Sequence, residues 1–151
     1  MAERGQVQSY RDLEVYQLAF AGAVKVHEMT MRLPKHEMYE VGSQIRRSAK
    51  GIPANIAEGF GRRRYKNEYL HFLTIALASC DETQVHLEML HATEGLDDST
   101  HESLVGLYST LGRKLNRLIQ VVLAQHVEPY RDAAGAPLRE DGPEYWPDAQ
   151  E

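Results

Sequence analysis

Seven basic side chains lie between positions 46 and 66, where Glu58 is the only acid, so this stretch carries a local charge of +6. They are Arg46, Arg47, Lys50, Arg62, Arg63, Arg64 and Lys66. Lysine and arginine at this density neutralise phosphates without reading bases, which gives salt-sensitive binding with little sequence preference. The cluster therefore predicts a surface for RNA or DNA, to which Arg113, Lys114 and Arg117 could add. The alternative is an ordinary solvated run of charge at a helix end.

Two Glu-x-x-His pairs, Glu68/His71 and Glu88/His91, have the spacing of di-iron ligands in ferritin-like bundles. A di-iron site needs the pairs on two helices, whereas both fall in one expected helix, about 30 Å apart along its axis. Elsewhere, no nucleophile stands at a fitting spacing from a base or a second carboxylate. We therefore expect no metal, no cofactor and no enzymatic activity.

A proline lies inside the basic stretch, in a segment that otherwise has the pattern of a helix. Pro53 has no N–H for the carbonyl of Ala49, so we expect a kink or local bend. Asn55 and Glu58 share a helical face with Gln44 beside the apolar seam. We expect Asn55 and Glu58 to be buried or half-buried and to satisfy loosened backbone or a neighbouring helix.

The elements that position these residues are all helical. We expect four long helices, over about 11–33 (ended by Pro34), 37–60, 65–93 (followed by Gly95) and from the capping residues at 97–100 to about 126. Short joints between them predict an antiparallel up-down-up-down four-helix bundle.

Apolar seams at heptad-like spacing mark the faces that should form the core. They are Ile45, Ala49, Ile52 and Ile56 in the second helix; Tyr69, Leu73, Ala76, Cys80, Thr83, Leu87 and Leu90 in the third; and Leu104, Tyr108, Leu111, Leu115, Leu118 and Val122 in the fourth. Cys80 should therefore be a buried, unreactive thiol.

The first helix has two apolar stripes on nearly opposite sides. One holds Leu13, Tyr16, Phe20, Ala23, His27 and Met31, and the other holds Val15, Ala19, Gly22, Val26, Met29 and Leu33. A surface helix of a monomer needs only one such stripe. We therefore infer that the first helix contributes to an oligomer interface.

The charge is distributed unevenly over the 151 residues. Residues 127–151 hold seven acids and two arginines, a net −5, which leaves residues 1–126 neutral. We expect an N-terminal arm (1–10), a single bundle domain (11–126) and an acidic, proline-rich flexible tail (127–151) that could mask the basic cluster. Acids stand where a signal peptide carries its basic region, and the apolar run near the start is too short to span a bilayer. The expected location is the cytoplasm, with no membrane contact.

Three segments carry a family resemblance: "DLEVYQLA", "GSQIRRSAKGIPANIAEGFGRR" and "EYLHFLTIALASCDETQVHL". Over residues 9 to 125 the chain resembles the four-helix-bundle family of ribosomal RNA intervening-sequence proteins. It is also similar to the accessory variability proteins of diversity-generating retroelements. The resemblance implies a homopentameric ring and no established enzyme activity; in the retroelement branch the ring is a partner of a reverse transcriptase and its RNA. It also makes Gln44, Arg46, Arg47, Pro53, Asn55 and Glu58 part of the family signature.

Two functions from different classes follow. The first is an oligomeric RNA- or DNA-binding accessory protein that grips phosphates through the basic residues between the second and third helices. The second is an oligomeric scaffold for another protein, in which the basic cluster is ordinary solvated surface.

Overall fold

The structure is a computed structural model that describes residues 7–125. Over this range it is all-helical. A short 3-10 helix, η1 (Tyr10–Asp12), precedes α1 (Glu14–Thr30), α2 (Lys35–Tyr39), α3 (Val41–Gly61), α4 (Lys66–Ala92) and α5 (Asp98–Ala124). The expected tail, 127–151, and most of the expected N-terminal arm lie outside the described residues.

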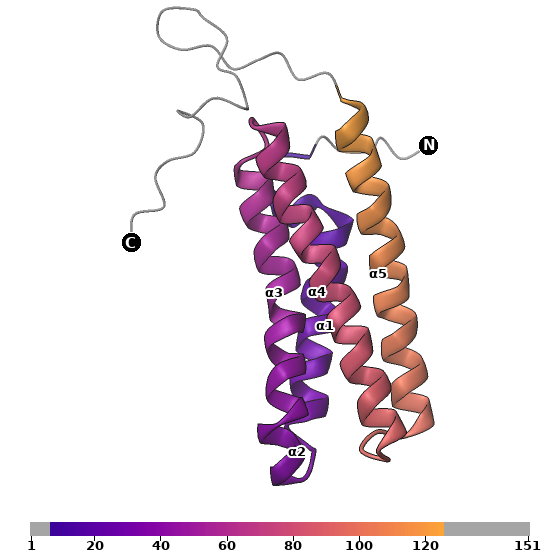
Figure 1. Cartoon of the computed structure of the whole chain (residues 1–151). Coiled ribbons are helices and arrows are strands. Elements are labelled where there is room, and N and C mark those ends of the chain that lie inside the picture. Colours follow the sequence, from indigo (N-terminus) through magenta and orange to yellow (C-terminus); the bar gives the residue numbers. More distant parts are fainter. Residues whose placement is uncertain (1–6, 126–151) are drawn as a thin grey trace, which may run out of the picture.

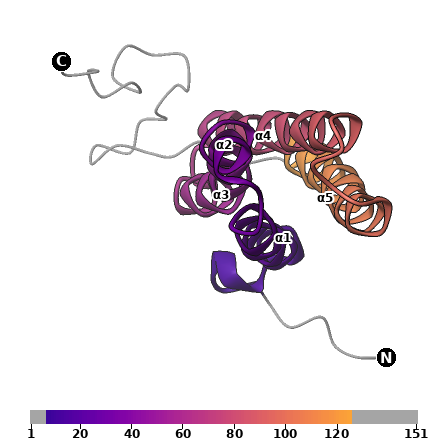
Figure 2. The same cartoon turned by 90° about the horizontal axis from the view of Figure 1, so that it is seen from below.

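The four long helices pack side by side, and each runs opposite to the next along the chain (Figure 1). The α3–α4 pair makes the most extensive contact, α4–α5 and α1–α3 follow, and α1–α5 is the loosest (Figure 2). The start of α1, the end of α3, the start of α4 and the end of α5 therefore meet at one end of the bundle, at the top of Figure 1.

The heptad seams form the core as the sequence predicted. All four seam residues of α3 and all seven of α4 are buried, and so are those of α5 apart from half-buried Leu118. Cys80 is fully buried, and burial raises the pKa of its thiol to about 11. Two hydroxyls tie the core of α3 to that of α4, since Ser48 Oγ lies 2.9 Å from Thr83 Oγ1.

The first two predicted helices are each wrong in extent. The first begins with η1 and is interrupted at Leu13, which is extended. The second is divided at Glu40 (φ −95°, ψ −100°) into short α2 and long α3. Beyond this break, α3 runs through Pro53 as uninterrupted helix.

The α4–α5 connection is built from hydrogen-bonded caps. Glu94 has a φ of 61°, while the N–H groups of Glu94 and Gly95 donate to the carbonyls of His91 and Leu90. This is a Schellman motif in which glutamate holds the left-handed position that glycine usually takes. The sequence predicted a stop at Gly95, which lies one residue later. At the start of α5, Asp97 accepts from the Thr100 N–H at 2.7 Å, as its place in the capping sequence predicted.

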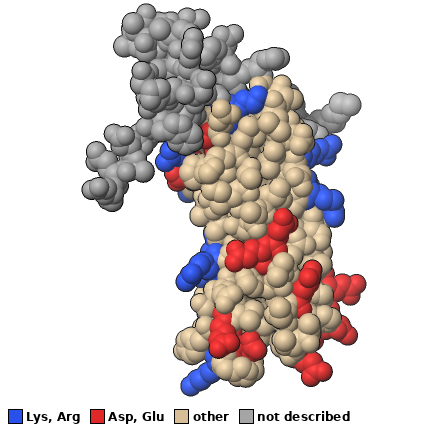
Figure 3. Space-filling view, viewed as in Figure 1, with Lys and Arg blue, Asp and Glu red and all other residues tan. Residues whose placement is uncertain are grey.

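Charge is segregated along the bundle. Most acidic side chains in Figure 3 gather over the lower half, where exposed Glu94, Asp97 and Asp98 surround the α4–α5 turn. In the upper half of this face, beside the grey residues, most of the charged side chains are basic. The basic residues between α3 and α4 thus lie at the opposite end from the acidic turn.

A candidate nucleic-acid interface at the α3–α4 corner

The connection between α3 and α4 places three arginines on the surface. Helix α3 ends at Gly61, and the N–H of Arg62 still donates to the carbonyl of Glu58 at 3.3 Å and that of Gly59 at 3.0 Å. The next residues turn the chain before α4 begins at Lys66. We call Arg62, Arg63, Arg64 and Lys66 the basic corner; the three arginines are exposed and Lys66 is half-buried.

Arg62 is already neutralised by its neighbours. Its guanidinium bridges two carboxylates, with Nη2 3.0 Å from Glu58 Oε1 and Nη1 3.4 Å from Glu68 Oε1. The hydrogen bond to Glu58 is the main cause that raises the pKa of Arg62, so it stays charged. Glu58 is therefore exposed and paired within its own helix, which corrects the expectation that it is buried or half-buried.

Arg63 and Arg64 have no carboxylate within ion-pair distance among the described residues. The Arg63 guanidinium stacks 4.0 Å from the centroid of the Phe60 ring, and its Nη1 donates to the Phe60 carbonyl at 2.9 Å. This contact orients the Arg63 guanidinium and leaves its charge uncompensated. Arg64 extends from the turn as an exposed side chain. These two residues are the corner's available cations.

Lys66 has a structural contact that the sequence did not reveal. Its Nζ donates to the carbonyl of Leu123 at 2.7 Å and to that of Gln125 at 3.0 Å. Both carbonyls lie at the end of α5, where free carbonyls and the negative end of the helix dipole favour a cation. Lys66 therefore fastens the end of α5 to the start of α4.

The basic residues earlier in α3 do not form one patch with the corner. Half-buried Arg46 reaches back across the α2–α3 break and donates from Nη2 to the Met38 carbonyl at 2.9 Å. Arg47 and Lys50 are exposed, but about three to four helical turns separate them from the corner. The seven basic residues therefore fall into three groups. Arg46 links α3 to α2, Arg47 and Lys50 are exposed within α3, and the other four form the basic corner.

The other signature residues of α3 are mostly structural. Pro53 is buried, and Asn55 is half-buried, with its Nδ2 donating to the Gly51 carbonyl at 2.8 Å. Asn55 is half-buried as expected, and its side chain bonds the backbone of its own helix at Gly51 rather than the Ala49 carbonyl that Pro53 leaves open. Gln44 is exposed. The further basic group of α5 also lies elsewhere, since Lys114 and Arg117 line the α1–α5 groove, where Lys114 Nζ is 2.7 Å from Glu14 Oε1.

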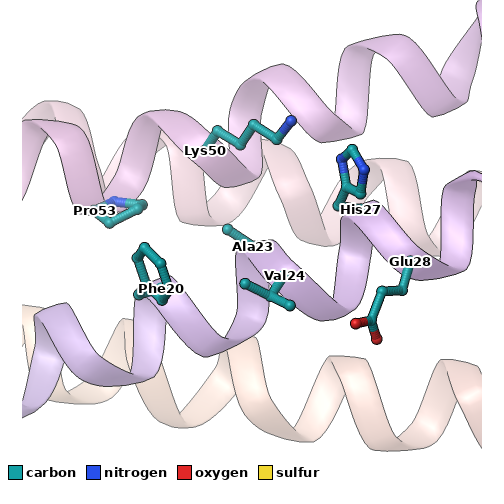
Figure 4. A pocket seen from close by; sticks show the side chains of 7 residues that line it. All are labelled: Phe20, Ala23, Val24, His27, Glu28, Lys50 and Pro53. Carbon is teal, nitrogen blue, oxygen red and sulfur yellow. The ribbon is translucent and has the colours of Figure 1, made fainter.

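An apolar hollow of about 430 Å³ lies between α1 and α3, and the sequence did not predict it. It is lined by Phe20, Ala23, Val24, His27 and Glu28 of α1 and by Lys50 and Pro53 of α3. Figure 4 shows Phe20 beneath Pro53 and Lys50 extending toward His27 from the other helix. The available signal was the stripe of α1 that holds Phe20 and Met31, which are 54% and 52% exposed. Val24, which belongs to neither predicted stripe, is 43% exposed.

The histidines of the described chain are engaged in small local contacts. His86 pairs with Glu82 at 3.3 Å, and His91 pairs with Asp98 at 2.6 Å. The His91 ring also stacks on His101, with centroids 3.9 Å apart. Within residues 7–125, no group of three or more His, Cys, Asp or Glu side chains could hold a metal ion.

The bundle and its basic corner define an all-helical protein with a candidate anion-binding end. The family of 23S rRNA-intervening sequence proteins matches residues 11–117, and the chain belongs to this family. A crystal structure from Bacteroides thetaiotaomicron, of a protein with unknown function from the S23 ribosomal protein family, has a similar fold, with a TM-score of 0.65 and 26% sequence identity. That match covers 70% of this chain and 95% of the other. A comparison with curated proteins gave no match. Among the described helices, none has both the length and the apolar character that a bilayer span requires.

Proposed function

We propose that this chain is a non-enzymatic accessory protein that binds RNA or DNA through phosphates at the basic corner. The observation that carries the proposal is the pair Arg63 and Arg64, which are exposed, adjacent and without a carboxylate partner among the described residues. Such a pair suits non-specific contact with a phosphate backbone. The family description refers to 23S rRNA, which makes RNA the first probe. The proposed location is the cytoplasm.

The proposal includes assembly of the protein as a homo-oligomer, and specifically as a pentameric ring. It is supported by the outer face of α1, where Phe20, Val24 and Met31 are exposed beside the apolar hollow. A second copy that covered this face would remove apolar surface from water. A ring would also repeat the basic corner, so one nucleic acid could contact several subunits and gain avidity. By its resemblance to the retroelement accessory proteins, a reverse transcriptase is a candidate partner.

The proposal is tested by titrating the purified protein into labelled single-stranded RNA and duplex DNA over a range of salt. We compare wild type with the double variant Arg63→Glu and Arg64→Glu. The expected loss at low salt is about tenfold or more, because two phosphate contacts become repulsive. Two lost contacts should also flatten the log–log salt slope on single strands by about 1.4.

The matched control reverses the same number of charges at the other end of the bundle. Arg32 and Lys35 are both exposed near the α1–α2 junction, and the variant Arg32→Glu with Lys35→Glu should keep most of the affinity. Binding by wild type that is indifferent to salt, or equal in the Arg63/Arg64 variant, would count decisively against a phosphate site at the corner.

The second candidate function is a scaffold for another protein. It is supported by the contacts that the basic corner makes within the fold. Arg62 is neutralised by Glu58 and Glu68, and Lys66 is bound to α5, so half of the corner is committed to the fold. The apolar hollow between α1 and α3 would then bind another protein. Recovery of one defined partner from nuclease-treated lysate, lost in a Phe20→Glu variant, would favour the scaffold.

A further inference from the structure

The end of α5 lies directly against the basic corner. Lys66 belongs to the corner and holds the carbonyls of Leu123 and Gln125, the last of which closes the described part of the chain. Residues 126–151 therefore depart from a point one hydrogen bond away from Lys66. An acidic segment on those residues is therefore tethered close to the basic corner.

The residues that follow divide into a neutral spacer and an acidic segment. Residues 126–139 hold two acids and two arginines, whereas residues 140–151 hold five acids and no lysine or arginine. The five are Glu140, Asp141, Glu144, Asp148 and Glu151. The 14-residue spacer spans at most about 50 Å when fully extended, so it can return the acidic segment to the corner.

We propose that the acidic segment, residues 140–151, is an intramolecular ligand of the basic corner and competes there with nucleic acid. The competitive part rests on the proposed function; the docking part does not. The corner is the favoured site because its Lys66 contacts the carbonyls at the point of departure. Its Arg63 and Arg64, three and two residues earlier in the chain, have no carboxylate partner among the described residues. Lys114, by contrast, is already paired with Glu14.

Each ion pair between the acidic segment and the corner contributes little. The contact is nevertheless populated because the segment is tethered to the corner. Exposed ion pairs contribute little individually and are screened by salt. A short tether, however, gives an effective concentration on the order of millimolar. If the intrinsic affinity is also about millimolar, the corner is covered about half the time, and nucleic acid binds about twofold more weakly than to an open corner. A tighter contact produces a larger difference.

The chain contains its own probe for docking, because Trp146 is its single tryptophan and lies within the acidic segment. We would measure the fluorescence anisotropy and acrylamide quenching of Trp146 in the full chain at low and high salt. Docking predicts that high salt lowers the anisotropy and increases quenching, and that Arg63→Gln with Arg64→Gln does the same at low salt. A Trp146 signal indifferent to both salt and this variant overturns the proposal. Release by Arg113→Gln with Arg117→Gln instead would move the contact to α5, and that also overturns it.

To measure competition between the acidic segment and nucleic acid, we compare how wild type and one variant bind a labelled oligouridylate. In the variant, the five acids of residues 140–151 are replaced by asparagine or glutamine. This variant should bind about twofold or more tightly than wild type at low salt, with the difference vanishing at high salt. The control changes Glu88, Glu94 and Glu102 to glutamine at the far end and should bind as wild type does. Equal affinity of the amide variant and wild type overturns the competition. If neither wild type nor any variant binds the RNA, the proposed function fails. The Trp146 fluorescence still tests whether the acidic segment docks on the corner.

Discussion

The neighbouring cations of the basic corner have different roles because each side chain contacts different groups. Arg62 meets carboxylates within its own helix and the next, and Lys66 finds the open carbonyls of α5, 57 residues further along the chain. Arg63 stacks on the Phe60 ring, and Arg64 makes no hydrogen bond, ion pair or ring contact with the described residues. A charge cluster in a sequence therefore overstates the charge available to a ligand. Mutations at Arg62, Arg63 or Lys66 remove a contact within the fold as well as a charge, whereas a mutation at Arg64 changes the charge alone.

Tyr108 offers a prediction at the scale of one atom. Its side chain is fully buried, its hydroxyl has no hydrogen-bond partner among the described residues, and burial raises its pKa. Removing a buried, unsatisfied hydroxyl should help, so Tyr108→Phe should raise the free energy of unfolding by about 1 kcal/mol at neutral pH. The measurement is urea unfolding, with exposed Tyr39→Phe as the control. A variant less stable than wild type would mean that the hydroxyl is satisfied in solution.

The same tyrosine predicts how stability changes with pH. The folded chain keeps the Tyr108 proton when the unfolded chain loses it near pH 10, so stability falls as pH rises above about 10. Burial of Cys80, with a pKa of about 11, adds a loss of the same sign from about pH 9. Tyr108→Phe should therefore lose less stability between neutral and alkaline pH than wild type does. Equal losses in the two proteins would contradict the assignment.

At the scale of the elements, two glycines test where the helices approach most closely. A Cβ on Gly59 of α3 would lie 2.9 Å from Phe72 Cβ and 3.4 Å from the Tyr69 carbonyl of α4, atoms that cannot rotate away. Gly59→Ala should therefore destabilise the bundle by about 1–3 kcal/mol despite better helix propensity.

Gly106 lies inside α5, and a Cβ there meets nothing within 4 Å. Gly106→Ala should stabilise by about 0.5–1 kcal/mol. Thermal or urea unfolding measures the stability of both variants. Equal changes in stability for Gly59→Ala and Gly106→Ala would mean that α3 and α4 can separate freely.

Helical seams could be predicted from the sequence because a buried stripe repeats at short, regular spacing. The seven seam positions of α4 are all buried, and the N-cap at Asp97 is a local signal four residues long, from Asp97 to Thr100. The division at Glu40 and the left-handed Glu94 could not be predicted, because neither residue is a glycine or proline that marks a break. The roles of Arg46 and Lys66 depend on tertiary contacts that spacing along a helix does not contain.

At the scale of the whole molecule, the outer face of α1 predicts self-association. Wild type should sediment as an oligomer, with a pentamer as the proposed state, and Phe20→Glu with Val24→Glu should shift it to smaller species by placing charges in the buried interface. The control, Val85→Glu with Met89→Glu, alters two equally exposed apolar residues on α4 and should leave the oligomer intact. Sedimentation velocity measures all three. Dissociation by the α4 variant alone would place the interface on α4, and a wild type monomeric at every concentration would refute assembly.

The basic corner and the acidic α4–α5 turn lie at opposite ends of the bundle. Helices α4 and α5 have 27 residues each, so about 40 Å separates the basic corner from the acidic turn. The screening length in physiological salt is about 8 Å. A polyanion at the corner is therefore screened from the carboxylates of the acidic turn. Subunits with parallel axes would therefore carry their basic corners on the same rim of an assembly, and a polyanion would be attracted to that rim first.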